Sequence, residues 1–98
     1  MTTVHTLASG SSGNAAVLSC GDTHLLIDAG ISCRRITTAL KELGLAPVEL
    51  TAILVTHTHS DHISGLNTLL KKTDCPILAT PRTCRELDCR FPGIEPRL

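Results

Sequence analysis

An apolar segment leads directly into a cluster of histidine and aspartate side chains. This arrangement limits the possible folds of the chain more than any other part of the sequence. Residues 50–56, LTAILVT, are apolar and rich in β-branched types, which predicts a buried β-strand. Residues 57–62, HTHSDH, follow at once and bring three imidazoles and one carboxyl group into six positions. Loops at the carboxyl ends of strands are where α/β sheets place their sites. The sequence therefore predicts a layered fold with a functional site at the end of this strand.

The remaining pattern predicts strands and helices around that segment. Ser32 and Thr80 are suited to cap helices, and Gly44 is placed to end the first helix. We expect strands at residues 3–8, 15–20, 23–28, 50–56 and 76–79 and helices at residues 33–43, 63–72 and 81–89. The predicted order is β-β-β-α-β-α-β-α, an α/β (α+β) architecture that opens with a β meander.

Composition narrows the class of protein and its partners. The chain has 98 residues, of which 42% are hydrophobic, and its nine basic and nine acidic residues cancel. Such a chain is globular, and its length is that of one domain or part of one. Neutral charge argues against general polyanion binding, which needs a basic surplus, but leaves room for a nucleic-acid substrate held at a local site.

The sequence also predicts the compartment. No apolar run approaches the roughly 20 residues that span a bilayer, and the first residues lack the basic and apolar regions of a signal peptide. Five cysteines, an odd number, are then expected to stay reduced. We expect a cytoplasmic protein with no membrane partner.

The histidine cluster has the chemistry of a metal site. Residues two apart in an extended segment point the same way, so His57 and His59 are expected to converge. Asp61 and His62, past the bend into the next helix, are expected to face a second point nearby. A lone histidine is more often an ordinary surface or core residue, but four such residues at this spacing favour metal binding. Imidazole and carboxylate ligands suit zinc, manganese or iron.

Three motifs resemble those of a known family. HTHSDH matches the HxHxDH signature of the metallo-β-lactamase superfamily, and LLIDAG at residues 25–30 is similar to its earlier Asp-containing motif. LASGSSGN at residues 7–14 resembles the N-terminal segment of the YycJ-like (WalJ-like) branch, which is associated with phosphodiester cleavage, including exonuclease action on DNA. The resemblance implies a metal-dependent hydrolase with a four-layer αββα sandwich, of which 98 residues supply about half.

The resemblance also implies roles for individual residues. His57 and His59 would bind the first of two divalent ions, and Asp61 with His62 the second. Asp28 would hold the histidine loop in place through hydrogen bonds, although a simple turn with Gly30 explains it equally well. The two ions would activate a shared water, and Asp61 would serve as the general base.

The chain departs from the family pattern in one respect. The superfamily takes its remaining ligands from later motifs, whereas this sequence has no histidine after His62. We therefore expect residues 1–98 to be a partial, truncated domain that binds metal weakly, because a catalytic zinc normally has three protein ligands. We also expect an uncovered sheet through which copies of the chain could associate.

The serine-glycine segment and the overall function leave alternatives open. Ser11, Ser12 and Asn14 are candidates for contacting a substrate phosphate, or else belong to a plain hairpin loop. The favoured substrate is DNA or another phosphodiester. The alternatives are a non-catalytic fragment with a vestigial metal loop and a thioester or lactam hydrolase of the same superfamily.

Overall fold

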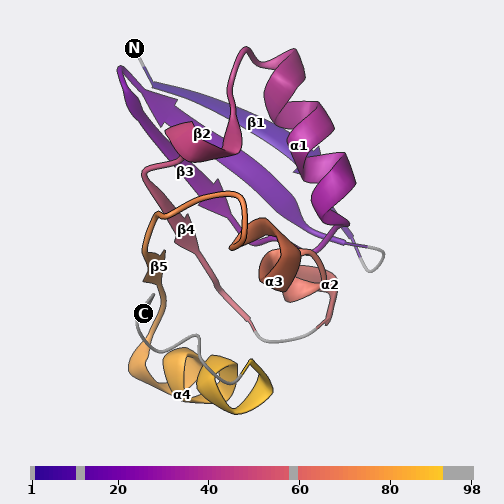
Figure 1. The fold of residues 1–98 in the computed structure, drawn as a ribbon, viewed down its shortest axis with the longest axis vertical. Coiled ribbons are helices and arrows are strands. Elements are labelled where there is room, and N and C mark those ends of the chain that lie inside the picture. The colour runs from indigo at the N-terminus through magenta and orange to yellow at the C-terminus, as the bar shows by residue number, and fades with distance from the viewer. Residues whose placement is uncertain (1, 11–12, 58–59, 92–98) are drawn as a thin grey trace.

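The chain forms one mixed sheet with helices packed against it (Figure 1). The computed structural model describes residues 2–10, 13–57 and 60–91, and the side chains of residues 60 and 61 lie outside that description. Five strands lie side by side in chain order. The strands are β1 (Thr2–Ala8), β2 (Ala15–Cys20), β3 (Thr23–Ile27), β4 (Ala52–Leu54) and β5 (Ile77–Leu78). The helices are α1 (Cys33–Glu42), the 3-10 turn η1 (Pro47–Glu49), α2 (Ser60–Ile63), α3 (Leu66–Leu69) and α4 (Pro81–Arg90).

The direction of the strands changes across the sheet. β1, β2 and β3 pair antiparallel, which confirms the predicted meander. β4 pairs parallel to β3, and β5 pairs parallel to β4. Parallel neighbours need a crossover connection, and α1 lies in the chain between β3 and β4. The carboxyl ends of β3, β4 and β5 consequently share one edge of the sheet, where the histidine segment begins.

One face of the sheet carries the core. The strand register places Val17, Leu26, Ile53 and Ile77 in one row, and each is at most 1% exposed. Helices α1 and α3 cover this row with fully buried leucine and isoleucine side chains, namely Ile36, Leu40, Leu66 and Leu69. The aliphatic side chains of the helix predicted at residues 33–43 thus form the face that packs on the sheet.

The opposite face of the sheet is less covered. Leu25 and Leu54 are only partly buried, while Leu78 is 50% and Val4 64% exposed. A single sheet with its packed helices is a partial domain of the expected αββα sandwich. Association of copies through this face stays a prediction.

The predicted helix at residues 63–72 was wrong in its extent. The segment forms two short helices, α2 and α3, separated at Gly65. The N–H of Gly65 donates to the carbonyl of Ala29 at 2.8 Å, and a Cβ at Gly65 would lie 2.1 Å from the Ile31 carbonyl oxygen. This contact between two backbone segments interrupts the helix, and sequence periodicity does not reveal it.

Other boundaries differ by a few residues. β4 is shorter than the predicted strand at residues 50–56, and β3 ends at Ile27 because Asp28 has a left-handed φ of 63°. The caps were predicted correctly: Ser32 accepts a hydrogen bond from the N–H of Arg35, and Thr80 from the N–H of Thr83. In the described residues no helix combines the length and apolarity needed to cross a bilayer.

Candidate metal centre

Asp28 joins the ends of the parallel strands β3 and β4. Its N–H donates to the Leu54 carbonyl at 2.7 Å. Its Oδ1 accepts from the N–H of Thr56 at 2.8 Å, and its Oδ2 accepts from the Thr56 hydroxyl at 2.6 Å. Asp28 is 4% exposed, so its carboxylate is largely shielded from water. Asp28 therefore holds the backbone immediately before the histidine segment in one position.

The same carboxylate orients His62. Nδ1 of His62 lies 2.7 Å from Oδ2 of Asp28, and the backbone carbonyl of His62 accepts from the N–H of Ala29 at 2.8 Å. A carboxylate accepts hydrogen bonds, so Nδ1 of His62 carries the proton and donates it. The lone pair of the ring then lies on Nε2, the arrangement of a metal-ligating histidine held by an acidic partner.

Thr56 orients His57 in a similar way, through a hydrogen bond to Nδ1. The Thr56 hydroxyl has one proton, and the short bond to Asp28 uses it. Nδ1 of His57, 3.1 Å from Thr56 Oγ1, must then donate to that oxygen. The lone pair of His57 is consequently also on Nε2. Sequence reasoning treated Thr56 as the end of a strand and missed this role, and its place directly before the cluster was the only signal.

The two oriented imidazoles lie together. The ring centroids of His57 and His62 are 4.8 Å apart, with an angle of 49° between the ring planes. Neutral imidazoles with the lone pair on Nε2 fit a divalent cation of the zinc type. Within the described side chains no group of three His, Cys, Asp or Glu residues is arranged to hold an ion. The structure thus brings two of the predicted ligands together and hydrogen-bonds Asp28 to Thr56 and His62, while the metal-binding roles stay predictions.

Two predicted ligands cannot be placed. His59 and the side chain of Asp61 lie outside the described residues. The convergence of His59 with His57 and the catalytic role of Asp61 therefore stay predictions. The backbone of Asp61 belongs to α2, which also carries His62.

The serine-glycine loop is tied to the same region. Ser11 and Ser12 lie outside the described residues, so their proposed contact with substrate stays a prediction. The side chain of Asn14 closes the turn: its Oδ1 accepts from the N–H of Gly10 at 3.1 Å, and its Nδ2 donates to the Gly10 carbonyl at 2.9 Å. The Asn14 carbonyl accepts from the N–H of Gly30 at 2.9 Å. The loop thus lies against the segment that follows Asp28.

Close backbone packing at this point requires glycine. A Cβ at Gly13 would lie 2.6 Å from the Gly30 carbonyl oxygen and from a methyl carbon of Ile31. Gly13 also has a φ of 146°, which side chains rarely tolerate. The amino-acid pattern predicts a hairpin loop here but does not reveal this packing contact.

Known proteins with similar sequences belong to the family that the sequence motifs resemble. The sequence profile of the metallo-beta-lactamase superfamily matches residues 8–88. The chain is 44% identical over 82 residues to "Exodeoxyribonuclease WalJ" of Streptococcus pneumoniae serotype 2, covering 84% of this chain and 30% of the relative. It is 40% identical over 82 residues to "Exodeoxyribonuclease YycJ" of Bacillus anthracis, covering 84% and 31%. The chain thus spans about 30% of the length of these curated relatives.

The fold also matches solved structures. The "Rm3 metallo-beta-lactamase" superposes with a TM-score of 0.73 at 26% identity, covering 86% of this chain and 32% of that one. The sheet order and helix placement described above are therefore those of a known fold.

Proposed function

Because the chain belongs to the metallo-beta-lactamase superfamily, we propose that it carries the first metal-binding segment of an enzyme that hydrolyses phosphodiester bonds in DNA. The observation that carries the proposal is the linkage of Asp28 to both Thr56 and His62. That linkage sets both imidazoles in the tautomer that presents Nε2 to a cation. The names of the relatives at 40–44% identity favour DNA over other substrates of the superfamily.

The proposal assigns a task to each residue of the segment. His57 and His59 would hold one divalent ion, and Asp61 with His62 a second, with zinc, manganese or iron as candidates. Bound ions would lower the pKa of a water molecule and stabilise the charge that develops on the phosphate. Asp61 would take up the proton of the attacking water, and Asp28 would position His62 without touching substrate.

The proposal also covers the compartment. All five cysteines lie in the described residues, and all are free thiols. Free thiols are typical of the reducing cytosol, where DNA would be available to the enzyme.

A chimaera tests the proposal directly. Residues 8–88 would replace the matching segment of the Streptococcus pneumoniae exodeoxyribonuclease, and end-labelled DNA would be incubated with Mn²⁺ or Zn²⁺. We expect release of nucleotides that EDTA abolishes and that Asp61→Asn lowers by at least 100-fold, the upper range of general-base contributions being about 10⁴. Asp22→Asn, in the exposed turn after β2, is the matched control and should leave the rate unchanged.

Three outcomes would contradict the proposal. A folded chimaera that releases no nucleotide would indicate a vestigial metal loop. Hydrolysis of a thioester or a β-lactam in preference to DNA would assign a different substrate class. Full activity of the Asp61→Asn chimaera would remove the proposed base.

A further inference from the structure

A cavity lies beside the outer part of α1, away from the imidazoles. It has a volume of about 320 Å³. Its apolar lining comes from Leu7 at the end of β1, Ile31 and Ala39, and its charged lining from Arg34, Arg35 and Glu42. Small-ligand sites have this composition, an apolar surface with a few polar groups, and usually exceed about 300 Å³. The volume is large enough for one small molecule or one residue of a polymer, but not for a protein helix.

The charge at one end of the cavity favours an anion. Arg34 and Arg35 are exposed, and neither guanidinium forms an ion pair with a described residue. They lie in the first turn of α1, which holds no acidic residue. The positive end of the helix dipole adds to their charge there. Glu42 lies at the other end of the helix, so it does not neutralise this pair.

One residue that lines the cavity is close in sequence to the candidate metal centre. Ile31 follows Asp28 by three residues, which span at most about 11 Å. The intervening Ala29 donates to the carbonyl of His62, and Gly30 donates to that of Asn14. Phosphates along one strand of DNA are spaced about 3.4 Å apart along the helix axis. About three nucleotides therefore span the roughly 11 Å between Asp28 and Ile31.

We propose that this cavity binds one nucleotide of the DNA strand that the metal centre cleaves. The base packs on Leu7, Ile31 and Ala39, and the adjacent phosphate pairs with Arg34 and Arg35. The inference rests on the proposed nuclease function. It adds a subsite that holds the strand a few nucleotides from the bond that breaks.

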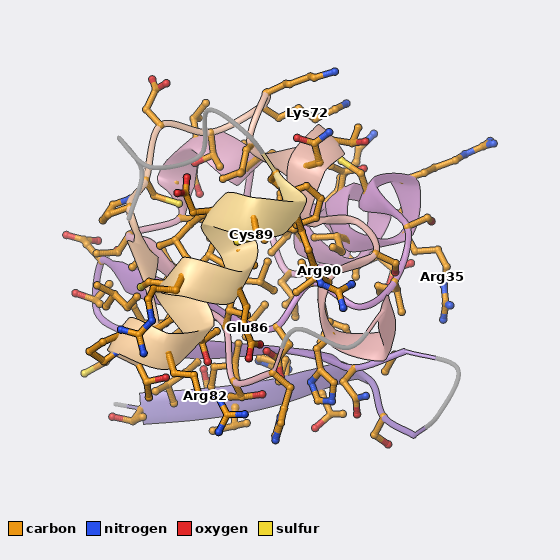
Figure 2. All side chains as sticks on the ribbon, turned by 90° about the horizontal axis from the view of Figure 1, so that it is seen from below. Arg35, Lys72, Arg82, Glu86, Cys89 and Arg90 are labelled. Carbon is orange, nitrogen blue, oxygen red and sulfur yellow. The ribbon has the colours of Figure 1, made fainter. Side chains whose placement is uncertain are left out.

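The test measures binding without catalysis. The 98-residue chain, checked for folding by circular dichroism, is titrated into a fluorescent single-stranded oligonucleotide in EDTA at several salt concentrations. Arg34→Gln with Arg35→Gln removes the two proposed contacts. Arg82→Gln with Arg90→Gln is the matched control, because α4 carries these arginines toward the opposite end of the molecule from α1, with Arg35 on another side (Figures 1 and 2).

Phosphate contacts have a defined salt signature. Each contact to single-stranded DNA contributes about 0.7 to the slope of log affinity against log salt, so the α1 variant should lose about 1.4 of that slope. Between 50 and 200 mM salt the unaltered chain then loses about sevenfold more affinity than the variant. The α4 control should keep the original slope. The proposal would be overturned if the α1 variant kept the slope of the unaltered chain, or if the α4 control lost as much slope as the α1 variant. Absence of any DNA binding would also overturn it.

A second measurement, which needs no variant, tests whether the cavity binds the base of the nucleotide. Amide NMR signals of Leu7, Ile31 and Ala39 should shift with a deoxynucleoside 5′-monophosphate and much less with deoxyribose 5-phosphate. Equal shifts with both compounds, or no shift at these residues, would overturn assignment of the cavity to a nucleotide. Both experiments exclude metal, so failure of the subsite is distinguishable from failure of DNA cleavage in the chimaera.

Discussion

The hydroxyl of Thr56 donates to Oδ2 of Asp28 at 2.6 Å, so that two residues 28 positions apart in the chain meet at the ends of parallel strands. The same carboxylate oxygen lies 2.7 Å from Nδ1 of His62. One buried carboxylate thus fixes the residue before the histidine segment and the last histidine of that segment.

Asp28→Asn should weaken metal binding and leave the fold in place. An amide in this position can present an N–H to Nδ1 of His62, which disfavours the tautomer with its lone pair on Nε2. Loss of such a partner lowers metal affinity by about 10- to 100-fold. Competition with a chromophoric chelator measures the change. Unchanged affinity would show that Asp28 only completes a turn, and Asp22→Asn serves as the control in the exposed β2–β3 turn.

Thr56→Val should destabilise the protein, whereas Thr56→Ser should not. Valine has nearly the same shape but leaves Oδ2 of Asp28 and Nδ1 of His57 without the hydroxyl. A hydrogen bond to a charged group contributes about 1.5–3 kcal/mol, and this substitution removes the one to the Asp28 carboxylate. Urea unfolding measures the free energy. The control Thr23→Val changes an exposed strand residue and should stay within about 0.5 kcal/mol.

Gly65→Ala should be among the most damaging single substitutions. The backbone φ of −97° at Gly65 is ordinary, so the effect is steric: the new Cβ would lie 2.1 Å from the Ile31 carbonyl oxygen. We expect a loss above about 4 kcal/mol or no folded protein, the range reserved for such clashes. Gly44→Ala, where a Cβ meets open space at a φ of 78°, should cost only about 1 kcal/mol. Thermal unfolding followed by circular dichroism distinguishes the two.

The two faces of the sheet should respond differently to truncation. Leu26→Ala removes a fully buried side chain from the row under α1 and should cost about 2–5 kcal/mol. Leu78→Ala, on the opposite face and 50% exposed in the described structure, should cost less than about 1 kcal/mol. Equal losses in urea unfolding would mean that the second face is also covered.

The isolated 98-residue chain should bind divalent metal weakly. The two sites of the proposal each have two protein ligands in this sequence, whereas a catalytic zinc normally has three. Isothermal titration with Zn²⁺ should give a shallow binding curve that His57→Ala reduces further. The control His5→Ala removes an exposed imidazole of β1 and should leave the curve unchanged. Tight binding of two equivalents, measured by elemental analysis, would contradict the prediction.

The order of strands and helices is predictable from the amino-acid sequence alone, as are the helix caps at Ser32 and Thr80 and the residue types of the candidate site. These follow from periodicity, turn chemistry and short motifs, which act between residues close together in the chain. The predicted helix at residues 63–72 failed because the contact at Gly65 involves Ile31, far away in sequence.

The side chains that hydrogen-bond to the histidines are brought to them by the fold. Asp28 and Thr56 meet because β3 and β4 pair in parallel with Ile27 opposite Leu54. The Asp28 carboxylate then sets the tautomer of His62, and the Thr56 hydroxyl sets that of His57, a consequence of distances that no spacing in the sequence encodes. Local sequence supplies the candidate ligands, and long-range packing orients His57 and His62.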